Sequence, residues 1–80
     1  MNVAKQLKLC PVTTQVCSVR SANGEHVGNL KLIGGVWKFK AIGYDASGNV
    51  MPGGGPLTER HNTTFAVLDE ALINVGLALD

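Results

Sequence analysis

Residues 36–44 read VWKFKAIGY, and this stretch decides the fold that the sequence predicts. Apolar and basic side chains alternate in it, with Trp37 and Phe39 separated by Lys38 and followed by Lys40. A period of two is typical of a strand that has one side on a core and the other in water. The stretch also holds the single Trp and the single Tyr of the chain. It therefore predicts the central strand of a sheet with one hydrophobic side and one basic side.

Two short turns precede this strand and divide the chain into hairpins. Asn23-Gly24 separates strand-like residues 15–22 from residues 25–33, and Gly34-Gly35 separates the latter from residues 36–44. Both pairs favour a type I′ turn, because this turn needs positive φ at both central residues. A longer turn over 45–48 is predicted to lead into a short fourth strand at 49–51.

Two-residue turns set the register of a hairpin, so the cross-strand partners can be predicted. The pairs predicted across the first turn are Arg20–Val27, Ser18–Asn29, Cys17–Leu30 and Val16–Lys31. The pairs predicted across the second turn are Leu32–Trp37, Lys31–Lys38, Leu30–Phe39 and Asn29–Lys40. Both hairpins then agree on an apolar inner side, and they leave an outer side with Val16, Ser18, Arg20, Val27, Asn29, Lys31, Lys38, Lys40 and Ile42.

The rest of the chain is predicted to form an arm, a loop and a helix. In residues 1–13 the pattern fits a helical turn or a strand at Gln6 to Leu9, Pro11 is expected to end either one, and we expect a loosely held arm. Residues 52–64 are expected to be a Gly/Pro-rich loop. Within the C-terminal helix region, residues 65–80, a helical stripe is predicted to cover the inner side of the sheet. The stripe consists of Leu68, Leu72, Val75 and Leu79. The expected fold is one α+β domain: an antiparallel three- to four-stranded β-meander at 14–51 with one C-terminal helix packed on one face.

Length and composition narrow the classes of protein. Eighty residues with a net charge of +1 indicate a single small domain. All seven basic residues precede Ala66, and the acidic Asp69, Glu70 and Asp80 follow it. No apolar run approaches the ~20 residues of a membrane span, and no apolar segment typical of a signal peptide follows the first lysines. We therefore expect a cytoplasmic protein with no membrane contact, whose cysteines stay reduced.

The outer side of the predicted sheet is the first candidate site. Lys31 and Lys38 oppose each other, and Arg20, Asn29 and Lys40 share their side. Like charges placed opposite each other destabilise a sheet, and a phosphate backbone would relieve the repulsion and release its counterions. Arg and Lys also read guanine and Asn reads adenine in a DNA major groove. The alternative is a solvated lysine face that only keeps the protein in solution.

These elements resemble the AP2 type of DNA-binding domain and the arm-binding domains of tyrosine recombinases. The resemblance consists of three antiparallel strands, the central Gly35-Val36-Trp37-Lys38-Phe39, and Phe65 followed by Asp69-Glu70-Ala71 at the start of a helix. It covers roughly residues 14–79. In that family the exposed sheet face contacts DNA, which implies this role for Arg20, Lys31, Lys38 and Lys40.

Two further kinds of site have weaker patterns. An anion could bind to the backbone amides of the Gly-rich loop, at Gly53, Gly54 and Gly55, with Arg60 and His61 completing the site. The loop lacks the lysine of a P-loop, and the alternative is a connector with no binding role. Cys10, Cys17, His26 and His61 lack the close spacing of zinc ligands, so we expect neither a metal nor a cofactor. No catalytic group with an orienting partner is identifiable, so we expect a binding module rather than an enzyme.

Ile73 and Leu77 are the last candidates, because they fall outside the predicted helical stripe. An exposed apolar pair on the helix of so small a domain indicates self-association, and a homodimer through these residues is the alternative to DNA binding. The sequence thus predicts a non-enzymatic module that binds DNA or another anion through its sheet. A homo-oligomeric interaction module is second, and an anion or small-ligand site in the Gly-rich loop is third.

Overall fold

A computed structural model describes residues 6–78 of the chain. An antiparallel sheet is followed by one C-terminal helix, which confirms the predicted α+β class. The strands are β1 (Lys8–Thr13), β2 (Val16–Arg20), β3 (His26–Ile33), β4 (Val36–Tyr44), β5 (Val50–Pro52) and β6 (Thr64–Phe65); η2 (Thr58–Arg60) is a 3-10 turn and α1 is Glu70–Leu77. The predicted three to four strands were too few, because β1 and β6 also join the sheet.

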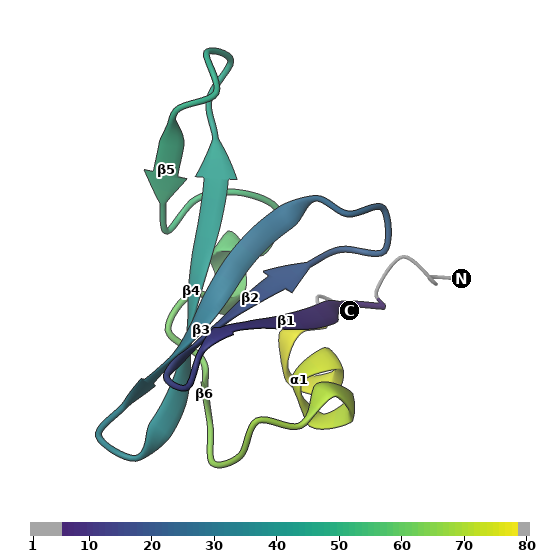
Figure 1. The fold of residues 1–80 in the computed structure, drawn as a ribbon. Helices are drawn as coiled ribbons and strands as arrows, with labels where there is room; N and C mark the ends of the chain where they lie inside the picture. The colour runs from purple at the N-terminus through teal and green to yellow at the C-terminus, as the bar shows by residue number, and fades with distance from the viewer. Residues whose placement is uncertain (1–5, 79–80) are drawn as a thin grey trace.

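The sheet order follows the chain from β1 to β5, and β4 has two partners along its other edge. Ile42 to Tyr44 pair with β5, whereas Trp37 and Lys38 pair with β6. Figure 1 shows α1 below the sheet and the β4–β5 hairpin extending away from it. The strand that the sequence singled out therefore lies at the centre of the structure.

The second hairpin has the predicted turn and register. Gly34 and Gly35 have φ of 58° and 84°, as a type I′ turn requires. Lys31 pairs with Lys38 and Leu30 with Phe39, and the pairs Leu32–Trp37 and Asn29–Lys40 also match the prediction. Lysines and core side chains consequently project from opposite sides of β4.

The first hairpin differs from its prediction in a way that changes one face. Its loop is one residue longer: the Ser21 carbonyl accepts from the Gly24 amide, and the Ser21 amide donates to the Glu25 carbonyl. Val27 then forms a bulge that restores the predicted register beyond it, so that Ser18 pairs with Asn29 as predicted. The predicted Arg20–Val27 pair is wrong, because Arg20 pairs with His26. The bulge puts Val27 into the core, where it is 2% exposed, rather than on the outer side.

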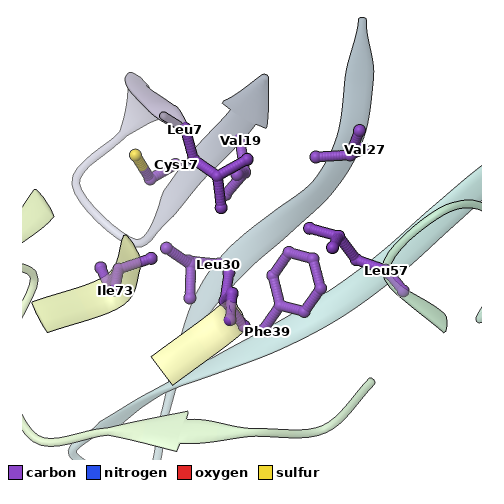
Figure 2. Close-up of a cluster of buried hydrophobic side chains, with 10 residues drawn as sticks. Leu7, Cys17, Val19, Val27, Leu30, Phe39, Leu57 and Ile73 are labelled. Atoms are coloured by element: carbon purple, nitrogen blue, oxygen red, sulfur yellow. The ribbon is translucent and has the colours of Figure 1, made fainter. Parts of the chain in front are cut away.

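The core lies between the inner side of the sheet and α1. Phe39 lies at its centre, surrounded by Leu30, Val27 and Leu57, and Ile73 reaches it from the helix (Figure 2). A Cβ atom on Gly28 would collide with the Phe39 ring, so the ring packs directly against the glycine backbone. This close approach explains why the strand carries a glycine at a buried position.

The helix presents a different face from the one predicted. Ile73 and Leu77 are 0% and 1% exposed, whereas Leu72 and Val75 of the predicted stripe are 54% and 77% exposed. Leu79, the last residue of that stripe, lies outside the described residues. The prediction that Ile73 and Leu77 form an exposed pair is therefore wrong, and they are unsuited to a subunit interface. Gly76 explains the rotation, because the Phe65 ring packs where a Cβ would stand.

The described part of the predicted N-terminal arm is an edge strand held by the helix. The Leu7 amide donates to Asn74 Oδ1 over 2.7 Å, and the Leu9 amide donates to Glu70 Oε2 over 3.0 Å. Pro11 is the next residue of β1 whose backbone nitrogen faces away from β2, and it has no amide hydrogen. The outward donors of β1 are thus bound or missing, which protects the edge from pairing with another chain. Residues 1–5 of the arm lie outside the described residues.

Candidate nucleic-acid interface

Basic residues are concentrated in the sheet. Five of the seven lie in strands, namely Lys8, Arg20, Lys31, Lys38 and Lys40. Within residues 6–78, the strands contain no Asp or Glu. We call the side of the sheet opposite α1 the outer face; alternation along the strands puts these five residues on it.

The centre of the outer face is a group of three lysines. Lys31 and Lys38 are direct cross-strand partners, which places their Cβ atoms about 4.5–5.5 Å apart. Lys40 follows two residues along β4, and its Nζ donates to Asn62 Oδ1 over 2.7 Å. The predicted lysines are therefore brought together on one face, where their like charges repel one another.

A second basic group lies on the β1 side of the face. Arg20 pairs with Lys8 of β1 and with His26 of β3. Its guanidinium donates to the Gly24 carbonyl over 3.1 Å, which tethers it beside the hairpin loop. The sequence prediction missed Lys8, because residues 1–13 were expected to be an arm. A charge alternating with Leu7 and Leu9 was the signal that could have identified the strand.

A polar cluster joins β3 to the far end of β4. His26 Nε2 lies 3.0 Å from Asn29 Oδ1, and His26 Nδ1 lies 3.2 Å from the Tyr44 hydroxyl. In the neutral imidazole, Nε2–H donates to Asn29 and the Tyr44 hydroxyl donates to Nδ1. Tyr44 is 47% exposed, so its ring is accessible while its hydroxyl is held. Neither His26 nor Tyr44 was predicted on this face, although Tyr44 continues the alternation of Lys38 and Lys40.

The acidic residues at the start of α1 accept hydrogen bonds from backbone amides of α1 and β1. Asp69 caps the helix by accepting from the Leu72 amide over 3.0 Å, and Glu70 accepts from Leu9 of β1. A carboxylate near a helix N-terminus is also stabilised by the helix dipole. The protein is therefore polarised, with its strand-borne bases on one side and the acids of α1 on the other.

The Gly-rich loop is folded along the edge of β4. The Gly53 amide donates to the Ala41 carbonyl and the Gly54 amide to that of Met51. His61 Nδ1 accepts from the Ala41 amide over 3.0 Å. Arg60 donates twice to the Ala78 carbonyl at the end of α1, over 2.9 and 2.6 Å. The Gly53 and Gly54 amides and the Arg60 guanidinium, which the predicted anion site needs as donors, thus hold the loop and α1 in place, and Gly55 packs its backbone against Ile42.

The cysteines and histidines are dispersed over the fold. Cys17 is buried in the core and Cys10 is exposed on β1. His26 is on the outer face, whereas His61 is in the loop beside β4. The residues with described positions contain no group of three or more potential ligands for a metal ion.

A hollow of about 330 Å³ opens on the inner side, away from the basic residues. Its walls include Leu7, Val27, Leu57 and Leu77, and Glu25 also lines it. The hollow is mostly apolar and lies between the first hairpin loop and the end of α1. It is separate from the outer face and contributes no group to it.

Comparison with known proteins gave no relative from which a function could be transferred. No family model matches the chain, no curated protein is significantly similar in sequence, and no solved structure matches significantly. Across residues 6–78, no helix has the length and apolar character that crossing a bilayer requires. A functional proposal therefore depends on the surface of the fold itself.

Proposed function

We propose that this protein is a non-enzymatic module that binds DNA through the outer face of its sheet. The observation that supports the proposal is the segregation of charge: five bases and no acid in the strands of residues 6–78. The direct Lys31–Lys38 pair adds a reason, because opposed lysines destabilise the free sheet and are relieved by a bound phosphate. A face that served only solubility would mix the two signs of charge.

The available contacts suit a polyanion that extends across several strands. Arg20 and Lys8 lie on β2 and β1, and the three lysines lie on β3 and β4. Each lysine that neutralises a phosphate releases counterions from the DNA. The logarithm of the binding constant therefore falls linearly with the logarithm of the salt concentration. Asn29 and Asn62 add neutral hydrogen-bonding groups between the charges.

The proposal is tested by titrating fluorescently labelled DNA with the protein at several salt concentrations. We expect salt-dependent binding that the double substitution Lys38→Glu, Lys40→Glu abolishes. Adding Glu59→Lys to the double variant restores two units of net charge away from the strands, and we expect it not to restore binding. Salt-insensitive binding, absent binding, or recovery in the triple variant would reject a specific role for the outer face.

A second candidate is self-association through the exposed side of α1. The exposed apolar residues Leu72 and Val75 of α1, together with Leu68 just before the helix, support it. They replace Ile73 and Leu77, which are buried. Sedimentation of the parent protein and of a Leu72→Glu, Val75→Glu variant tests this candidate. A monomeric parent at high concentration would dispose of it.

A further inference from the structure

We infer that the outer face binds an unpaired DNA strand in preference to a duplex, and that one base of the strand stacks on Tyr44. The inference rests on the proposed DNA binding and specifies that the bound DNA is single-stranded. Two observations carry it: the width of the basic surface and the exposed, tethered ring of Tyr44.

The basic surface as a whole, with residues on four adjacent strands, is too wide to enter a DNA groove. Its residues lie on β1, β2, β3 and β4, which are adjacent in the sheet. Strands are about 4.8 Å apart, so the four backbones span about 14 Å before side chains are added. The major groove is about 12 Å wide and admits a helix or a two-stranded ribbon. The same surface can lie flat along a single strand, which has no groove to enter.

Tyr44 provides a surface for a base at the end of this face. Tyr44 is 47% exposed, and the bond between its hydroxyl and His26 Nδ1 limits the rotation of its ring. His26 is fixed in turn by Asn29. A held aromatic ring loses little freedom when a base stacks on it, and stacking tolerates any base. The ring therefore favours a ligand whose bases are unpaired.

The lysines and Tyr44 lie in a row along one strand. Lys38, Lys40 and Tyr44 project from the same side of β4, at positions two and four residues apart. A rise of about 3.3 Å per residue separates the two lysines by about 7 Å and puts Tyr44 about 13 Å beyond Lys40. A DNA strand along β4 would contact the lysines with its phosphates and Tyr44 with a base.

The position of Tyr44 in the fold leaves room for such a ligand. It is the last residue of β4, next to the turn that leads to β5, and the β4–β5 hairpin extends away from α1 (Figure 1). Its cross-strand partner there is Val50, which is itself exposed. Substitution of Tyr44 should therefore affect binding without disturbing the core.

The test compares three labelled ligands of equal length by fluorescence anisotropy: a single strand, the same strand in a duplex, and an abasic strand. We expect the single strand to bind more tightly than either of the others. Tyr44→Leu should weaken binding to the single strand by between about fivefold and a hundredfold. The same substitution should leave the duplex and abasic affinities within about twofold. Tyr44→Phe keeps the ring and should retain most of the single-strand affinity.

The outcomes separate this inference from the proposed function. Equal or tighter binding of the duplex, or an unchanged single-strand affinity in Tyr44→Leu, overturns the inference while DNA binding stands. Loss of single-strand affinity in Tyr44→Phe as large as that in Tyr44→Leu overturns the stacking role. If no ligand binds, or if Lys38→Glu, Lys40→Glu binds as the parent does, the proposed function itself is wrong. Thermal unfolding of each variant verifies that the fold is intact.

Discussion

The rotation of α1 about its axis can be tested by changing two adjacent residues. Ile73 is completely buried against the sheet, and its neighbour Leu72 is 54% exposed. We compare Ile73→Ala with Leu72→Ala, because both variants place alanine, the best helix former, at a central position of the same helix. The alternative rotation, with Leu68, Leu72 and Val75 on the sheet, predicts the opposite order of effects.

The expected loss of stability follows from the atoms removed. Ile73→Ala deletes three buried carbons at about 0.8 kcal/mol each, which gives about 2.4 kcal/mol before any cavity is counted. With incomplete collapse around the cavity, such substitutions cost about 2–5 kcal/mol in total. A value of about 3 kcal/mol would lower the midpoint of unfolding by roughly 12–24 °C in a domain of this size. For Leu72→Ala we expect a change of less than about 1 kcal/mol, because half of the side chain is already in solvent.

Chemical denaturation followed by Trp37 fluorescence measures both free energies of unfolding. If Leu72→Ala destabilises the protein by more than Ile73→Ala, the helix packs with its other face on the sheet. Equal losses would mean that both residues are partly buried, as in a helix without a fixed rotation. Either result would contradict the packing described above.

Three further predictions concern charge, thiols and pH. Lys38→Glu should raise the free energy of unfolding in the absence of DNA by about 0.2–1 kcal/mol, because it replaces a repulsive pair with Lys31 by an attractive one; a loss of stability in thermal unfolding would contradict this. Burial raises the pKa of the Cys17 thiol, so an alkylating reagent should modify Cys10 in the native protein and Cys17 only after unfolding; native reaction of both thiols would be inconsistent with the core. The Asn49 backbone amide donates to the Asp45 carboxylate and lowers its pKa below the ordinary value of 3.8, so Asp45 stabilises the folded state above this pH. This stabilisation is lost as pH falls through the pKa of Asp45 in the folded state. Asp45→Ala should therefore destabilise the protein more at pH 7 than at pH 2, and an equal loss of stability at both pH values would refute the argument.

The hairpins show how far local patterns determine this fold. Gly34 and Gly35 both accept positive φ, so the turn, the register and the two sides of β4 followed from the sequence. At the first hairpin only Gly24 has positive φ, and the Ser21 hydroxyl and Asn23 carboxamide accept from the Glu25 amide. These side-chain bonds favour a longer loop, whose extra residue is offset by the bulge. The register beyond the bulge was predicted correctly, whereas the turn and the Arg20–Val27 pair were not.

The two larger errors share a cause, which is contact between distant parts of the chain. Asn74 binds both the amide and the carbonyl of Leu7, so the helix face that carries it must point toward β1. Helical periodicity alone could not distinguish this face from the Leu68–Leu72 stripe, because both are apolar. Pro11 was expected to end any strand, but at an edge its missing amide hydrogen costs no pairing.

The candidate site was predicted in part for the same reasons. Lys31, Lys38 and Lys40 follow from alternation and the second turn, and the structure places them together. Lys8 depends on the edge strand, whose only local signal is the alternation of Leu7, Lys8 and Leu9, and His26 depends on the bulge at Val27. Tyr44 could have been predicted, because it continues the alternation of residues 36–44 onto the outer face.

The salt dependence of DNA binding tests the central claim, that the outer face is a surface for phosphates. The affinity for a single strand is measured from low to high salt for the parent and for a variant with Lys31, Lys38 and Lys40 changed to Ala. Each phosphate contact contributes about −0.7 to the slope of log K against log salt on single strands, so the variant's slope should be smaller by about 2. Equal slopes in the two proteins, or a parent that binds no DNA at low salt, would contradict the claim.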